Sequence, residues 1–171
     1  MSSLPAHLWV QKMTNNDVLR GVRYALALSP ATMAEIFSIS GQTVAQDKIA
    51  DLLKKEGEEG FVSCPDGLME DFLSGLIIHR RGRQEGKPAH PPQAARVLTN
   101  NSILKKLRIA LELKEEDMLA ILQQSGNPVS KPELSALFRK AGHKNYKECG
   151  DQFLRHFLKG LAIRYREAAA R

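Results

Sequence analysis

One stretch of this chain occurs twice, and the two copies align without a gap. Residues 15–28 (NNDVLRGVRYALAL) match residues 100–113 (NNSILKKLRIALEL), and the match continues at a constant offset of 85 positions. A gapless internal repeat of this length indicates that one structural unit is built twice. Identical pairs recur along the match: Asn16 with Asn101, Arg23 with Arg108, Cys64 with Cys149, Asp66 with Asp151, and Gly75 with Gly160.

Apolar residues recur at helical spacing in four segments of each copy. Two copies are too few for an open solenoid, so each is expected to cover the apolar face of the other. The predicted fold is all-α, with two tandem four-helix repeats packed with pseudo-two-fold symmetry. The predicted helices of the first copy cover about residues 16–28, 30–41, 46–55 and 66–80, and those of the second include residues 131–140 and 151–166. The predicted domains are a leader (1–14), a first repeat (15–82), a proline-containing linker (83–99) and a second repeat (100–171).

Local signals place several helix ends. An Asn at the start of the first helix is a good N-cap, and Ser29 before Pro30 is another. Ser130 and Glu133 have the spacing of a capping box. Gly75 and Gly160 fall in the middle of predicted helices, where glycine costs about 1 kcal/mol relative to alanine. We therefore expect each of these glycines to admit a neighbouring helix at short distance.

The composition is that of an ordinary globular chain, with 43% apolar and 26% charged residues among 171. No apolar run approaches the roughly 18 residues of a membrane span, and no signal-peptide pattern is present. Two cysteines make no disulfide framework, so reduced thiols and a cytoplasmic location are expected. The sequence leaves the oligomeric state open.

Charge is divided unequally between the repeats. Residues 15–82 hold 7 Lys or Arg against 10 Asp or Glu, whereas residues 100–171 hold 14 against 8. Such an asymmetry favours contact between the second repeat and a polyanion, or attraction between the two halves. The residues predicted to contact nucleic acid are cations of the second repeat: Lys105, Lys106, Lys144, Lys147, Arg155 and Arg164.

The second and third helices of a repeat are joined by a short glycine-containing turn, which also fits a helix-turn-helix. Its second helix, at 131–140, is net basic, with Lys131, Arg139 and Lys140 against Glu133. A solvated basic face and cations that complement helix dipoles are the structural alternatives to nucleic-acid binding.

Two pairs of charged residues are identical in both repeats. Arg23 and Arg108 border the apolar stripe of the first helix, and Asp66 and Asp151 begin the fourth. A structural role is the favoured interpretation, with Arg23 pairing with Asp66 and Arg108 pairing with Asp151. An exposed, anion-binding arginine is the alternative.

The cysteines offer little support for a metal site or a nucleophile. Cys149 lies near His143 and His156 in the sequence, but the first repeat has no matching histidines and no CxxC or HxxxH spacing occurs. No phosphate-binding loop or hydrolase motif is present either. The sequence therefore predicts no enzyme, no cofactor and no metal.

Two motifs carry a family resemblance. The segment Asn15-Asn16 through Arg23-Tyr24-Ala25-Leu26, and the segment HKNYKECGDQFLR at 143–155, resemble the YehS-like bacterial proteins, which carry two tandem copies of a domain of unknown function. The resemblance covers residues 13–166. It implies an all-helical cytosolic protein and brings no activity or catalytic residues.

The function expected from the sequence is a non-enzymatic binding module that contacts nucleic acid through its basic second repeat. The alternative is a protein–protein adaptor or regulatory subunit that acts through its helical surfaces. Neither interpretation calls for a membrane.

Overall fold

The computed structural model describes residues 12–83 and 98–170, with side chains to residue 167. Within these residues the chain forms helices and no strands, which confirms the predicted all-α fold. The first repeat contains α1 (Asn15–Leu26), α2 (Pro30–Ile39), α3 (Gln46–Leu52) and α4 (Asp66–Arg81). The second contains α5 (Asn100–Ala110), α6 (Glu115–Gln124), α7 (Lys131–Leu137) and α8 (Asp151–Ala170).

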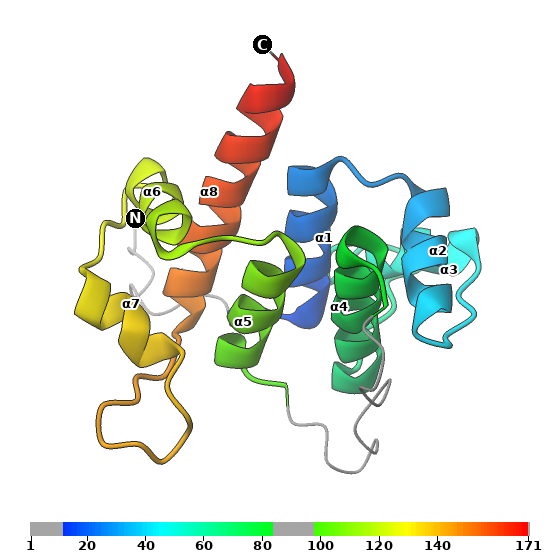
Figure 1. The fold of residues 1–171 in the computed structure, drawn as a ribbon. Coiled ribbons are helices and arrows are strands. Elements are labelled where there is room, and N and C mark those ends of the chain that lie inside the picture. The colour runs from blue at the N-terminus through cyan, green and yellow to red at the C-terminus, as the bar shows by residue number, and fades with distance from the viewer. Residues whose placement is uncertain (1–11, 84–97, 171) are drawn as a thin grey trace, which may run out of the picture.

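Four helices form a parallel bundle at the centre of the molecule. The side chain of Asn15, at the start of α1, donates to the carboxylate of Asp66, at the start of α4, and Asn100 makes the same contact with Asp151 at the start of α8. The backbone N–H of Met13 also donates to Asp151. The amino ends of α1, α4, α5 and α8 therefore lie together at one end of the bundle, the lower end in Figure 1.

The two repeats exchange helices across this bundle, in the sense that the first helix of each repeat packs mainly on the fourth helix of the other repeat. Helix α1 packs mainly on α8, and α5 packs mainly on α4, whereas the contacts of α1 with α4 and of α5 with α8 within each repeat are slight. The remaining helices mirror each other, because α2 packs on α4 and α3 while α6 packs on α8 and α7. This reciprocal pattern is the predicted pseudo-two-fold arrangement, and Figure 1 shows the two helix pairs flanking the bundle on opposite sides.

Arginines at equivalent positions join the repeats at the other end of the bundle. Arg166 of α8 donates to the backbone carbonyl of Tyr24 at 2.7 Å, and its guanidinium stacks 4.1 Å from the centre of the Tyr24 ring. Arg81 of α4 reaches Glu112, just beyond α5, at 3.4 Å. The exchanged helices are thus tied near their carboxyl ends as well as along their apolar faces.

The two mid-helix glycines admit a neighbouring helix, as predicted. A Cβ placed on Gly75 of α4 would lie 2.1 Å from the carbonyl oxygen of Ile36 in α2. At Gly160 of α8 the corresponding distance to Ile121 in α6 is 2.3 Å. Because no side chain fits in that space, glycine allows the backbones of the two helices to touch.

The predicted caps are confirmed in part. The Ser29 hydroxyl caps α2, with Pro30 in its first turn, and Ser130 and Glu133 form a capping box on α7. The first helix is different, because Thr14 and Thr99 are the N-caps and the asparagines that follow lie inside α1 and α5. The side chains of these asparagines are consequently free to bond elsewhere.

Some predicted boundaries also shift. Helix α7 ends at Leu137, so Arg139 and Lys140 lie in the loop that follows rather than on a recognition helix. Helix α8 extends to Ala170. Most of the predicted leader, residues 1–11, and of the linker, residues 84–97, lies outside the described residues. Within the described part, no helix is both long and apolar enough to cross a bilayer.

Candidate nucleic-acid interface

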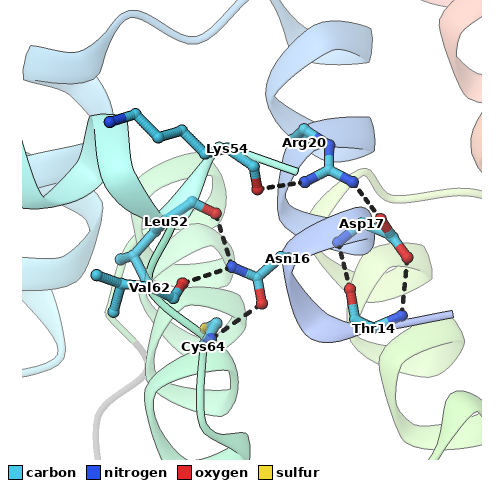
Figure 2. A network of polar contacts seen from close by, with 8 residues as sticks. All are labelled: Thr14, Asn16, Asp17, Arg20, Leu52, Lys54, Val62 and Cys64. Atoms are coloured by element: carbon cyan, nitrogen blue, oxygen red, sulfur yellow. Dashed lines mark hydrogen bonds and ion pairs between the residues drawn. The ribbon is translucent and has the colours of Figure 1, made fainter. Parts of the chain in front are cut away.

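A buried asparagine fastens the loop between α3 and α4. The side-chain amide of Asn16, which is 2% exposed, donates to the carbonyl oxygens of Leu52 at 2.9 Å and Val62 at 2.8 Å. Its carbonyl accepts the backbone N–H of Cys64 at 3.0 Å. Figure 2 shows these bonds converging on the first turn of α1. One side chain therefore holds both ends of the loop.

The second repeat contains the same set of hydrogen bonds. Asn101 donates to the carbonyl oxygens of Leu137 and Lys147, both at 2.9 Å, and accepts the N–H of Cys149 at 2.8 Å. The preceding asparagine adds a bond to the cysteine carbonyl in each repeat, at 3.0 Å from both Asn15 and Asn100. The two loops, which we call the α3–α4 loop (53–65) and the α7–α8 loop (138–150), thus have matching anchors.

The anchored loops carry opposite charge. The α3–α4 loop contains Glu56, Glu58 and Glu59, and the matching residues of the α7–α8 loop are Ala141, His143 and Lys144. At a fourth position, Val62 packs against the core, whereas its counterpart Lys147 is exposed. Over the whole loops, residues 53–65 hold two lysines and three glutamates, net −1, whereas residues 138–150 hold four cations and Glu148, net +3.

Five exposed cations gather around the α7–α8 loop. Four of them lie in the loop, and Lys105 lies on α5, one turn after the anchoring Asn101. In the first repeat the residues that match Lys105 and Arg139 are Arg20 and Lys54, and the Arg20 guanidinium donates to the Lys54 carbonyl at 2.8 Å (Figure 2). Within the described residues, none of the five cations has a side-chain hydrogen bond or ion pair. We call this set the amino-end cations: Lys105, Arg139, Lys140, Lys144 and Lys147.

The bundle reinforces the positive charge of this end. The amino ends of the four central helices lie here, and each carries a partial positive charge of roughly half an elementary unit from the helix dipole. Asp66 and Asp151 offset two of these dipoles, and capping side chains satisfy the first N–H groups of α1 and α5. The amino-end cations add solvent-exposed positive charge to these dipoles.

Three of the six cations predicted to bind nucleic acid are engaged within the protein. Lys106 turns towards α4, 3.3 Å from the Ser74 hydroxyl and 4.0 Å from the carboxylate of Glu70. Arg164 pairs with Asp117 at 3.0 Å. Arg155 is half-buried on α8, one turn from Asp151, and has interactions of its own. Lys105, Lys144 and Lys147 remain, and Arg139 and Lys140 join them.

The predicted Arg–Asp pairs do not form. Asp66 is bonded to Asn15, and Arg23 lies eight residues further along α1, about 12 Å at 1.5 Å per residue. Arg108 instead donates to the carbonyl of Leu113 at 3.1 Å, and its guanidinium lies 4.7 Å from the centre of the Phe138 ring. Arg108 therefore has a structural role different from the predicted one, and both repeated aspartates accept a hydrogen bond from an asparagine.

The two cysteines are poorly suited to catalysis. Cys64 is 4% exposed and Cys149 is 3% exposed. Burial, with a smaller contribution from the neighbouring carboxylates of Asp66 and Asp151, raises the pKa of each thiol to about 12. Such thiols stay protonated at neutral pH, whereas a nucleophile needs the thiolate. Among the described residues, no group of three or more His, Cys, Asp or Glu side chains is placed to hold a metal ion.

A cavity of about 710 Å³ lies beside the start of α1 in the first repeat. Its walls carry both signs of charge, with Arg20 and Lys55 on one hand and Asp17 and Glu56 on the other, and the Phe61 side chain contributes an aromatic surface. Arg20 is already bonded to Asp17 and to the Lys54 carbonyl. Neither cysteine lines this cavity.

The sequence was a poor guide to the asparagine anchors, although the repeated Asn-Asn pair and the repeated cysteine were visible. Their separation of 48 residues hides the contact, because nothing local shows that the cysteine N–H returns to the first helix.

Comparison with known proteins places the chain in a family. A family model described as a protein of unknown function (DUF1456) matches residues 15–82 and again residues 100–167. The chain is 48% identical to the uncharacterized protein YehS of Escherichia coli (strain K12) over 152 residues, which cover 89% of this chain and 96% of YehS. No solved structure matches significantly. The chain therefore belongs to the DUF1456 family, of which it carries two tandem copies of the conserved unit.

Proposed function

We propose that this protein is a non-enzymatic module that binds the phosphate backbone of nucleic acid through its amino-end cations. The observation that carries the proposal is the contrast between the two loops. Asn16 and Asn101 hold equivalent frames. The α7–α8 loop nevertheless has Ala141, His143 and Lys144 where the α3–α4 loop has three glutamates, and it gains the exposed Lys147 in place of Val62. Because the frame does not require those cations, their placement is best explained by something that they contact.

The geometry supports contact with phosphate rather than the reading of bases. Lysine and arginine that release condensed counterions from phosphates supply most sequence-independent affinity. The α7–α8 loop is fixed at Lys147 and Cys149 by Asn101, so less conformational entropy is lost on binding than with a loose loop. Helix α7, with only seven residues, offers little for a recognition helix in a groove.

A protein–protein adaptor remains the second candidate, and it has less support. Adaptor surfaces usually expose apolar residues in a contiguous patch. Among the described residues the large exposed apolar side chain is Tyr24, and Arg166 stacks on it. The acidic α3–α4 loop is the surface to test if nucleic acid does not bind.

The proposal is tested by titrating labelled DNA and RNA with the purified protein at about 50 mM and about 200 mM salt. The variant Lys144→Glu/Lys147→Glu is compared with Lys48→Glu/Lys159→Glu, which has the same net charge and alters exposed lysines outside the loop. We expect binding that weakens steeply with salt, a loss of about tenfold or more in the loop variant, and a much smaller loss in the control.

Two outcomes would argue against the proposal. The absence of binding at the lower salt concentration would remove nucleic acid as the partner. Equal losses in the two double variants would show that net charge, rather than the α7–α8 loop, accounts for the affinity.

A further inference from the structure

Each anchored loop presents an aromatic residue that the core does not use. Phe61 and Tyr146 occupy the same position, and each closes a turn through its backbone N–H, to Glu58 at 3.1 Å and to His143 at 2.9 Å. Both side chains are partly exposed, and neither packs against the hydrophobic core. A large aromatic side chain kept at the surface in both repeats is available to a ligand.

The surroundings of these two rings differ in charge. In the first repeat, Phe61 borders the cavity together with the acids Asp17 and Glu56. The matching positions in the second repeat are Ser102 and Ala141, so the second repeat lacks both acids. The two cations that line the first-repeat cavity, Arg20 and Lys55, are matched by Lys105 and Lys140, so the positive charge is retained at these positions.

On the basis of the proposed function, we infer that the amino-end cations bind single-stranded nucleic acid, with one base stacked on the ring of Tyr146. In this inference the flanking phosphates are bound by Lys105, Lys140 and Lys144. The residues that match the first two, Arg20 and Lys55, line the same cavity as Phe61 in the first repeat. An aromatic surface among cations is the usual combination in proteins that bind single strands, because any base has a face that can stack on it. The bases of a duplex are already stacked on one another and offer no such face.

The experiment compares labelled oligothymidylate and oligouridylate of about 16 nucleotides with a duplex of equal length. The variants are Tyr146→Leu, which removes the ring but keeps apolar bulk, Tyr146→Phe, which keeps the ring, and Phe61→Leu, the matched change in the acidic loop. We expect Tyr146→Leu to weaken single-strand binding by roughly 5- to 100-fold. Tyr146→Phe and Phe61→Leu should bind almost as tightly as the unaltered protein.

The results separate this inference from the proposed function. Equal affinity for strand and duplex, together with no effect of Tyr146→Leu, would overturn the inference while the loss in Lys144→Glu/Lys147→Glu still supported the proposed function. An equal loss in Phe61→Leu would also overturn it, because the ring of the second repeat would then have no special role. A urea-unfolding midpoint measured for each variant shows whether a loss of binding is a loss of fold.

Discussion

The side-chain carbonyl of Asn16 accepts the backbone N–H of Cys64 at 3.0 Å, across 48 residues of sequence. The same bond joins Asn101 to Cys149 at 2.8 Å. In each repeat the side-chain amide of the same asparagine also donates to two carbonyls, one at the last residue of α3 or α7 and one in the loop, so the side chain satisfies three backbone groups at once. This explains why an asparagine stands at this position in both copies.

Removing this asparagine anchor should lower the free energy of unfolding. In Asn16→Ala the carbonyls of Leu52 and Val62 and the N–H of Cys64 lose their partner in a buried site, and each such group costs about 1–3 kcal/mol. We expect the free energy of unfolding in urea to fall by about 3 kcal/mol or more. Asn145→Ala, an exposed asparagine whose side chain makes no described hydrogen bond, should change it by less than about 0.5 kcal/mol. Similar values for the two variants would contradict the role given to the anchor.

The close helix contacts predict opposite effects for two glycines of the same helix. Gly75→Ala forces α4 away from the Ile36 carbonyl, and we expect a net destabilisation of about 1–3 kcal/mol despite the better helix propensity of alanine. Gly67→Ala meets no atom within 4 Å, so it should stabilise the protein by up to about 1 kcal/mol. Thermal unfolding of both variants checks the difference. A neutral Gly75→Ala would mean that α2 and α4 separate without cost.

The helices and the two-fold arrangement could be predicted because their signals are local or repeated. Apolar spacing, the Ser130 capping box and the mid-helix glycines each depend on a few neighbouring residues, and the gapless repeat supplied the symmetry. The exchange of helices was not predictable in this way. The stripe of α1 shows that one face is buried, but it does not show whether α4 or α8 covers it.

The candidate site was predicted only in part for a similar reason. A lysine on a helix appears the same in sequence whether it faces water or a distant carboxylate. Lys106 contacts Glu70 and Ser74 in the other repeat, and Arg164 forms an ion pair with Asp117 on another helix. Lys144 and Lys147 lie in a polar loop, and in such a segment the sequence is a better guide to exposure.

The buried thiols should resist alkylation in the folded protein. Because burial raises the pKa of Cys64 and Cys149 to about 12, almost no thiolate exists at pH 8 and the sulfur atoms are covered. We expect iodoacetamide to leave the native protein unmodified over a period in which the urea-unfolded chain gains two labels, as measured by mass spectrometry. Rapid labelling of the native protein would restore a reactive-thiol role.

Asp151 should contribute to acid unfolding. The side chain of Asn100, the N–H of Met13, and more distantly Arg155 and Lys12, lower the pKa of this carboxyl below its ordinary value. Its contribution to stability is therefore present above the unfolded-state pKa of about 4 and is lost as the pH falls through the lower folded-state value. Asp151→Asn should be less stable than the unaltered protein at pH 7, and the gap should shrink below about pH 4. Glu148→Gln, at an exposed loop residue, is the control, and a gap that stays constant with pH would contradict the prediction.

The exchange of helices predicts that neither repeat is stable alone. Residues 12–83 by themselves leave the face of α1 that packs on α8, and the face of α4 that packs on α5, without cover. We expect each separate repeat to show little cooperative unfolding by circular dichroism, and an equimolar mixture to regain it as a one-to-one complex. Cleaving the intact protein at a protease site inserted within residues 84–97 provides the control, because the two halves should remain together. Two separate repeats that each unfolded cooperatively as monomers would show that α1 and α4 can cover each other, and the exchanged contacts would then be dispensable for folding.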